Sequence, residues 1–165
     1  MWIYLLRHGV AEAPRLGLAD EDRALTRDGL ADLHAASRAW GRLVTAPSVV
    51  FCSPYARARQ TADVFSQAAA PSAALRVDAS YTPSADPARA IAQLEEEMLS
   101  QTESVAVIGH EPHLGYLLGS LLSAQPRQSV PLNTGMLVGV QTEGATSLVA
   151  GLRFALSQEA AASLT

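Results

Sequence analysis

The chain has 165 residues, of which 48% are apolar and 17% charged; this composition is typical of one globular domain and excludes a disordered chain. Its formal net charge of −4 and its lack of a basic tract argue against nucleic acid as a partner. No apolar run approaches the roughly 18 residues that span a bilayer, and the short N-terminal apolar stretch does not predict a signal peptide, so we expect a cytoplasmic protein without a membrane contact.

The first part of the chain is predicted to form a strand, a helix and a second strand. Residues 2–6 are a continuous apolar run, as in strands buried on both faces of a sheet. Thr26 is placed to cap a helix, with Leu25 and Leu30 as a hydrophobic staple. Val49–Cys52 is a second apolar run, and it ends in the single cysteine, so no intramolecular disulfide is expected.

The middle of the chain is predicted to hold three helices and a third strand. Ser53-Pro54, Asp86-Pro87 and Glu111-Pro112 each place a polar residue before a proline, which is typical of a helix start. Residues 105–108 lie between the second and third of these helices and predict another buried strand. Apolar blocks therefore alternate with helices.

Two more strands are predicted near the end of the chain, at residues 136–140 and 147–156. Residues 68–74 and 80–87 are expected to be connecting loops. No repeat or low-complexity tract divides the chain. We therefore expect a single domain over residues 1–165, an α/β fold built as a three-layer α/β/α sandwich with a mostly parallel central sheet.

Polar residues directly follow three of the predicted strands. Arg7 and His8 follow the first strand, Ser53 the second, and His110 comes just after residues 105–108. Ligands of open α/β sheets bind outside the carboxyl ends of the strands, so these side chains are expected to converge. Arginine binds tetrahedral oxyanions, and histidine can act as a nucleophile or carry protons. The sequence therefore predicts a phosphate site with two imidazoles.

One arginine of the second helix is predicted to face the same site. At 100° per residue, Arg57 lies at the edge of the inner apolar face, whereas Arg59 lies on the outer side with Asp63. We therefore expect Arg57 to join Arg7 as a phosphate ligand. The sequence contains no Walker loop and no acidic cluster suited to magnesium, so arginines are expected to supply the positive charge.

The segments LLRHG, SPYARARQTA and VIGHEPHLG resemble, in order, three signatures of the histidine phosphatase superfamily, also called phosphoglycerate mutase-like, and DEDRALTRDG resembles a fourth segment. The forms of the second and third segments look most like the SixA branch, which removes phosphate from phosphohistidine in signalling proteins. The resemblance implies a phosphoglycerate mutase-like fold. It also implies that His8 is the nucleophile that becomes phosphorylated, that Arg7 and Arg57 bind the phosphate, and that His110 donates to the transferring oxygens.

A proton donor for the leaving group is not evident from the sequence. Ser80 stands where larger relatives supply a carboxylic acid, and the nearby alternatives are Glu12, Asp20, Asp22 and Glu111. An alkoxide leaves poorly unless it is protonated, whereas the imidazole of phosphohistidine leaves readily from a labile N–P bond. The missing acid therefore favours a phosphoramidate substrate.

Three further residues are candidates to line the pocket. Arg23 and Glu12 lie in the loop expected to border its mouth, and Thr134 opens a late strand. His113 forms an H-x-x-H pattern with His110, but a zinc site needs a third or fourth ligand and no suitable partner is evident. We therefore predict neither a metal nor a cofactor.

The resulting expectation is a metal-independent phosphohistidine phosphatase that acts through an intermediate on His8. Its expected partner is a phosphohistidine-bearing signalling protein, such as a phosphotransfer domain. One alternative is a small-molecule phosphomonoesterase of the same superfamily. Another alternative, from a different class, is a non-catalytic module that binds phosphate or a phosphoprotein, which would use the arginines without a nucleophile.

Overall fold

The structure, a computed structural model, describes residues 1–123, 128–144 and 146–164 of the chain. Within these residues, one six-stranded sheet is formed by β1 (Trp2–Arg7), β2 (Val49–Cys52), β3 (Ala74–Val77), β4 (Ser104–Gly109), β5 (Leu137–Thr142) and β6 (Ala150–Leu156). The strand order is β3-β2-β4-β1-β5-β6. The first four strands in this order pair in parallel, and β5 and β6 pair antiparallel. The predicted mostly parallel sheet is confirmed.

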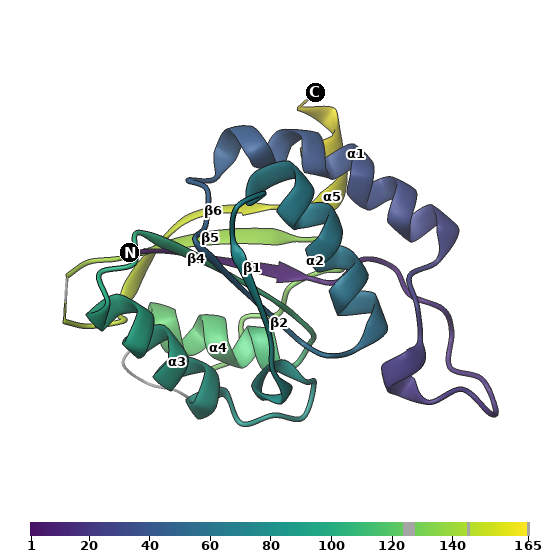
Figure 1. Cartoon of the computed structure of the whole chain (residues 1–165), viewed down its shortest axis with the longest axis horizontal. Helices are drawn as coiled ribbons and strands as arrows, with labels where there is room; N and C mark the ends of the chain where they lie inside the picture. The colour runs from purple at the N-terminus through teal and green to yellow at the C-terminus, as the bar shows by residue number, and fades with distance from the viewer. Residues whose placement is uncertain (124–127, 145, 165) are drawn as a thin grey trace.

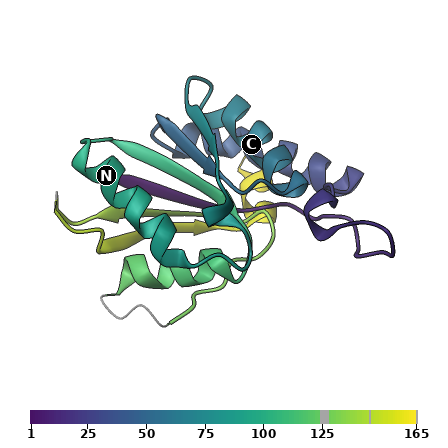
Figure 2. The ribbon, with the colours of Figure 1, turned by 60° about the horizontal axis from the view of Figure 1, so that its bottom comes forward.

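Helices cover both faces of the sheet (Figure 1). One face is covered by α1 (Arg27–Leu43), α2 (Ala56–Ala69) and α5 (Gln158–Ser163), and the other by α3 (Pro87–Leu99) and α4 (His113–Leu122). Two short 3₁₀ helices, η1 (Asp20–Asp22) and η2 (Ala79–Tyr81), lie in connections. The predicted three-layer arrangement is confirmed (Figure 2). None of the helices in the described part of the chain is long and apolar enough to cross a membrane.

Each central strand contributes side chains to two separate cores. In β1, Tyr4 and Leu6 pack in the cluster beneath α1 and α2, whereas Ile3 and Leu5 pack in the cluster beneath α3 and α4. Side chains alternate between the two faces of a strand, so a strand covered on both faces is apolar at every position. This explains the continuous apolar run that predicts β1.

Parallel register brings the carboxyl ends of three strands to one edge of the sheet. Arg7 of β1 pairs with Gly109 of β4, so both strands end at the same level. The N–H of His8 donates to Gly109 O at 3.1 Å, and the N–H of Ser53 donates to Ile108 O at 3.1 Å. These bonds extend the strand pairing by one residue, and they place the residues after β1, β2 and β4 side by side.

Two of the predicted helix starts are confirmed. Thr26 caps α1 by accepting a hydrogen bond from the N–H of Gly29 at 2.9 Å. Asp86 caps α3 by accepting one from the N–H of Ala88 at 3.0 Å. In both cases a short polar side chain satisfies a donor in the first turn that has no partner within the helix.

The other two predicted helix starts are wrong. α2 begins three residues after Ser53, whose hydroxyl lies 2.8 Å from Nε2 of His110. α4 begins two residues after Glu111, whose carboxylate accepts a hydrogen bond from the N–H of Leu132 at 2.9 Å. Both side chains contact distant segments of the chain, and this competes with a capping role.

The structure also contains two elements that the sequence pattern does not indicate, β3 and α5. α2 extends to Ala69 and β3 begins at Ala74, so the loop expected at residues 68–74 is shorter. All four residues of β3 are exposed at the edge of the sheet, and they lack the buried pattern of the central strands. β6 begins at Ala150, later than the expected residue 147.

Candidate active site

The imidazole of His8 is held in one tautomer at the end of β1. Its Nδ1 lies 2.7 Å from the carbonyl oxygen of Gly9, and a carbonyl only accepts, so Nδ1 carries the hydrogen. Nε2 then has a lone pair, and it accepts a hydrogen bond from Nε of Arg57 at 3.3 Å. Burial, together with the nearby guanidiniums, lowers the pKa of His8 to about 4, although its bond to Gly9 opposes this shift. His8 is therefore neutral at pH 7, with Nε2 able to act as a nucleophile.

His110 lies beside His8, although 102 residues separate them in the sequence. The ring centroids are 4.9 Å apart with the planes at 59°, and the ring of Tyr55 meets His110 edge-on at 5.0 Å. Nε2 of His110 contacts the Ser53 hydroxyl at 2.8 Å, whereas Nδ1 is buried and has no hydrogen-bond partner among the described residues. Burial, and to a lesser degree the charges of His8 and Arg57, lower the pKa of His110 to about 2.

Arg57 connects His8 to the loop that precedes α1. It is 4% exposed and stacks over the ring of Tyr55 at 4.9 Å. Beyond its Nε contact to His8, Nη1 donates to the backbone oxygen of Asp20 and Nη2 donates to Asp20 Oδ2 at 2.9 Å. The predicted inward orientation of Arg57 is confirmed, and Arg59 is exposed as expected.

Arg7 is the last residue of β1, and it retains donor capacity next to His8. Its Nη1 donates to the backbone oxygen of Leu132 at 2.7 Å, while its buried Nε has no partner among the described residues. Its charge contributes to the lowered pKa of His8 and opposes the raised pKa of Glu111. The structure therefore places a second guanidinium within electrostatic range of the His8 ring.

Arg23 and Asp20 form an ion pair at the border of the site. Nη1 of Arg23 lies 2.6 Å from Asp20 Oδ1, and its Nε donates to the backbone oxygen of Glu12 at 2.6 Å. The carboxylate of Glu12 accepts a hydrogen bond from the N–H of Ala24 at 3.2 Å. The hydrogen bonds from Arg57 and Arg23 lower the pKa of Asp20, so this carboxyl is ionised at neutral pH.

Thr134, a candidate pocket residue, lines a cavity that also includes Val10. This cavity measures about 350 Å³, and Thr134 lines it together with residues of α1 and α5. The next residue, Gly135, donates its N–H to the backbone oxygens of Arg7 and His8, both at 3.1 Å. Gly135 has a φ of +67°, a conformation that favours glycine. This segment therefore supports the backbone of His8.

The candidate proton donors differ in their surroundings. Ser80 is buried in η2, where its N–H donates to Asp78 Oδ1 at 2.7 Å. Burial raises the pKa of Glu111, although its bond to the N–H of Leu132 opposes this shift. Asp22 is exposed on η1. Asp20 is the carboxylate that directly contacts Arg57, and its lowered pKa makes it a poor acid.

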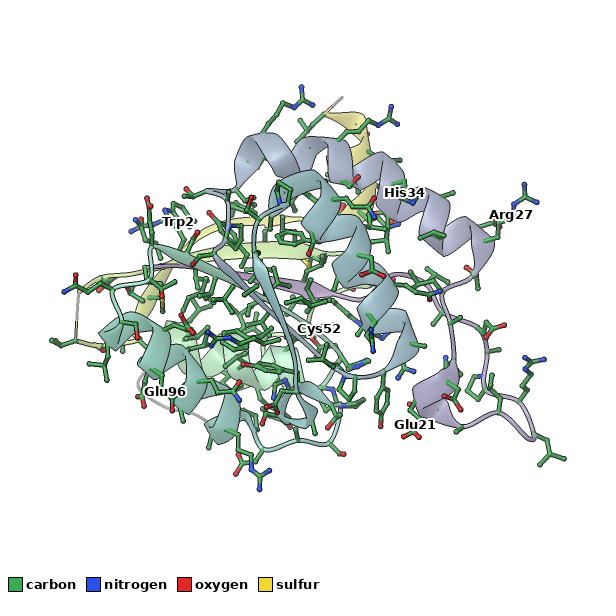
Figure 3. All side chains as sticks on the ribbon, viewed as in Figure 1. Trp2, Glu21, Arg27, His34, Cys52 and Glu96 are labelled. Carbon is green, nitrogen blue, oxygen red and sulfur yellow. The ribbon has the colours of Figure 1, made fainter. Side chains whose placement is uncertain are left out.

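Neither His113 nor Cys52 lies at a site with evident chemistry. His113 is 1% exposed, with its ring edge-on to Tyr81 at 6.1 Å, and burial lowers its pKa. Within the described ranges, no three His, Cys, Asp or Glu side chains gather closely enough to hold a metal ion. Cys52 is fully buried, and burial raises the pKa of its thiol to about 12, as expected for a structural cysteine. His34 is exposed on α1, also as expected (Figure 3).

A wide cavity opens next to the imidazoles, between η1 and the start of α2. It measures about 580 Å³ and is open to solvent. Its lining is about equally polar and apolar, and it includes both acidic and basic side chains: Glu21, Asp22, Tyr55, Arg59, Gln60 and Asp63. Tyr55 joins this cavity to the site, because its ring also contacts Arg57 and His110.

Residues 3–80 match the family model of the histidine phosphatase superfamily (branch 1). The matched segment spans slightly less than half of the chain. The matched residues include Arg7, His8 and Arg57 and end before His110. This similarity is therefore to a superfamily of phosphatases. A comparison with curated proteins found no match.

Solved structures share the fold of this chain over nearly its whole length. The protein histidine phosphatase SixA, complexed with tungstate, has a TM-score of 0.84 and 24% identity, covering 96% of this chain and 97% of its own. A protein from Agrobacterium tumefaciens assigned as a phosphohistidine phosphatase SixA has a TM-score of 0.76 and 23% identity, covering 94% and 97%. The alpha-ribazole phosphatase from Shigella flexneri has a TM-score of 0.71 and 15% identity, covering 96% and 97%. These similarities confirm the phosphoglycerate mutase-like fold.

The lowered pKa values of the buried histidines predict a loss of stability in mild acid. As the pH falls from 6.5 toward 4, the unfolded chain takes up protons on His8 and His110 that the folded protein does not bind. The free energy of unfolding should therefore fall by about 1.4 kcal/mol per pH unit for each such histidine. Urea unfolding at several pH values between about 7.5 and 5 measures this slope.

The variant His110→Gln should reduce the slope by about one proton's contribution. His34→Gln, which removes an exposed histidine from α1, is the matched control and should leave the slope unchanged. A slope in His110→Gln equal to that of the wild type would contradict the assignment of a neutral His110.

Proposed function

We propose that this protein is a phosphohistidine phosphatase that works through a phosphorylated His8, without a metal. The observation that carries the proposal is the arrangement of the His8 ring. Its Nδ1–H is held by the Gly9 carbonyl, while Nε2 keeps its lone pair next to Arg57 and His110. A neutral imidazole with one fixed tautomer is suited to nucleophilic attack on phosphorus.

In the proposed first step, the phosphoryl oxygens accept hydrogen bonds from Arg7, Arg57 and His110, and Nε2 of His8 attacks phosphorus in line. The bond from phosphorus to the substrate imidazole breaks as the new N–P bond forms, and the substrate ring, which carries a proton on its other nitrogen, leaves as a neutral imidazole. The phosphorylated ring becomes cationic, and the Gly9 carbonyl opposite Nδ1–H stabilises this charge. In the second step, water attacks phosphorus, releasing inorganic phosphate and restoring neutral His8.

The arginines supply the electrostatic part of this chemistry. The transferring phosphoryl group carries negative charge on three oxygens, and catalysis consists mainly of positioning the group and neutralising that charge. Arg7 has an unpartnered Nε among the described residues, so it can donate to a phosphoryl oxygen without losing a contact. Arg57 is bound by Asp20, so it must exchange that partner for the phosphoryl group.

Two features support a phosphohistidine on a protein as the substrate. Asp20, the carboxylate next to Arg57, is ionised and cannot readily protonate a leaving alkoxide, whereas imidazole leaves without such help. The cavity beside Tyr55 is open to solvent, which suits a phosphate carried on a protein surface. The family-model match over residues 3–80 and the similarity of the fold to SixA are consistent with this substrate class.

A small-molecule phosphomonoesterase is the second candidate, and one observation favours it. Burial raises the pKa of Glu111, the carboxyl that directly follows His110 in the sequence, so protonation is easier for this group than for an exposed carboxyl. Such an acid could protonate an alkoxide. The two candidates share His8 as the nucleophile and differ in the leaving group.

The nucleophile is tested by trapping the intermediate. Incubation with a ³²P-labelled phosphohistidine protein followed by denaturation should give a label that is stable in alkali and lost in acid, as expected for a phosphorylated histidine. His8→Ala should lose this label and lower turnover by about 10³-fold or more, because the substitution removes the proposed nucleophile. His34→Ala is the matched control and should behave like the wild type. Undiminished turnover in His8→Ala would sink the assignment of His8 as the nucleophile, whereas a wild-type protein that binds phosphate without turnover or label would favour the non-catalytic binding module.

The leaving group is tested by comparing substrates at equal concentration. The second-order rate constant for a phosphohistidine-bearing phosphotransfer domain should exceed those for sugar phosphates and p-nitrophenyl phosphate by at least about tenfold, a margin below the roughly 10²–10⁴-fold that acid catalysis contributes to an ester. Equal or faster hydrolysis of the esters would instead support the phosphomonoesterase. In that case Glu111→Gln should slow ester hydrolysis.

The competition between Asp20 and the phosphoryl group predicts a gain in anion affinity. Asp20→Asn removes the negative charge that binds Arg57, so the inhibition constant of inorganic phosphate should fall about fivefold, corresponding to about 1 kcal/mol for a partly exposed ion pair. Asp22→Asn is the matched control, because Asp22 lies on the same turn and is exposed. An unchanged or weaker affinity in Asp20→Asn would show that Asp20 orients Arg57 instead of competing for it.

A further inference from the structure

We infer that Ser53 is a positioning residue that fixes the tautomer of His110, so that His110 presents Nδ1–H to the transferring phosphoryl group. This inference rests on the proposed function, in which His110 is one of the donors to the phosphoryl oxygens. Ser53 is fully buried where β2 ends, and its hydroxyl lies 2.8 Å from Nε2 of His110. Its position before a proline suggests a helix cap, but α2 begins three residues later without a side-chain cap.

The direction of the hydrogen bond between Ser53 and His110 follows from the other contact of the hydroxyl. A serine hydroxyl has one hydrogen to donate and two lone pairs. The N–H of Tyr55 donates to the Ser53 oxygen at 3.4 Å, which uses one lone pair and leaves the hydrogen available. Nε2 of His110 is the acceptor that the described contacts offer to this hydrogen. A neutral His110 that accepts at Nε2 must carry its own hydrogen on Nδ1.

The Nδ1–H of His110 has no acceptor within the described part of the chain. His110 is 1% exposed, and a buried donor without a partner is costly, by about 1–3 kcal/mol. The ring of His8 lies 4.9 Å away, so a phosphoryl group attached to His8 would sit next to the His110 ring and could accept this hydrogen. The Nδ1–H of His110 would then gain its hydrogen-bond acceptor only when the phosphoryl group is bound. A donor placed in advance where negative charge develops stabilises the transition state.

The opposite tautomer of His110 would turn its attraction to the phosphoryl group into a repulsion. With hydrogen on Nε2, His110 would donate to Ser53 and present the Nδ1 lone pair to the phosphoryl oxygens. Lone pairs on both sides would repel, and the site would lose one of its donors. The Ser53 hydroxyl therefore decides whether His110 attracts or repels the transferring group. Ser53 also lies four residues before Arg57, so one short segment positions two of the donors.

The test compares Ser53→Ala with a matched control, Ser104→Ala. Ser104 is equally buried and hydrogen-bonded, but it lies at the start of β4, at the opposite end of the strand that leads to His110. In the full-length wild-type protein, ¹⁵N NMR of the imidazoles should show a protonated Nδ1 and a bare Nε2 for His110. In Ser53→Ala the signals should move toward a mixture of tautomers, and kcat should fall roughly 10–100-fold with a smaller change in KM. Ser104→Ala should lower only the melting temperature.

Each outcome decides the inference. A wild-type His110 with hydrogen on Nε2 would overturn it, and so would a Ser53→Ala protein that keeps both the Nδ1–H tautomer and its kcat. If Ser53→Ala does not fold, the wild-type spectrum still decides, and Ser53→Thr, which retains the hydroxyl, should preserve the Nδ1–H tautomer. Failure here is distinguishable from failure of the proposed function. Normal labelling of His8 in an active Ser53→Ala protein would remove the role of Ser53 alone, whereas turnover in His8→Ala would remove the phosphatase mechanism itself.

Discussion

The parallel register of β1, β2 and β4 is the constraint on which the candidate site depends. Arg7 pairs with Gly109 and Cys52 pairs with Ile108, so the next residue of each strand emerges at the same edge of the sheet. Because side chains alternate with a period of two, a slip of one residue would turn the following imidazole to the opposite face. The apolar residues of both cores hold this register, and the backbone bonds at the strand ends extend it to His8. The spacing of the two imidazoles is therefore set by the packing of the core.

Much of the fold follows from local patterns, which is why the sequence predicts it. Strands covered on both faces are continuously apolar, and the helix starts at Thr26 and Asp86 are determined by bonds within a few residues. The inward position of Arg57 follows from helical spacing. The starts expected at Ser53 and Glu111 fail because long-range contacts occupy both side chains. β3 is missed because an exposed edge strand requires no apolar pattern.

The site also contains residues that the sequence predicts and contacts that it does not predict. His8, Arg7, Arg57 and His110 stand in recognisable segments, and the structure brings the two imidazoles and Arg57 into direct proximity. The contact between Asp20 and Arg57 joins residues 37 apart through an irregular loop, and no spacing rule predicts such a pair. The tautomer of His110 likewise depends on a hydroxyl 57 residues away. Sequence therefore indicates which groups are present, while the loop and strand geometry determines how their hydrogens are arranged.

The ion pair between Asp20 and Arg57 affects how the affinity for phosphate should depend on ionic strength. A buried guanidinium without a counterion would destabilise the folded protein, but here Asp20 provides that counterion for Arg57. In the proposed mechanism, phosphate binding is an exchange of anions, in which the Asp20 carboxylate leaves Arg57 as the phosphate arrives. The net charge near this arginine changes little during the exchange. Affinity at this position should accordingly depend less on ionic strength than it would for an arginine that meets its anion from bulk water.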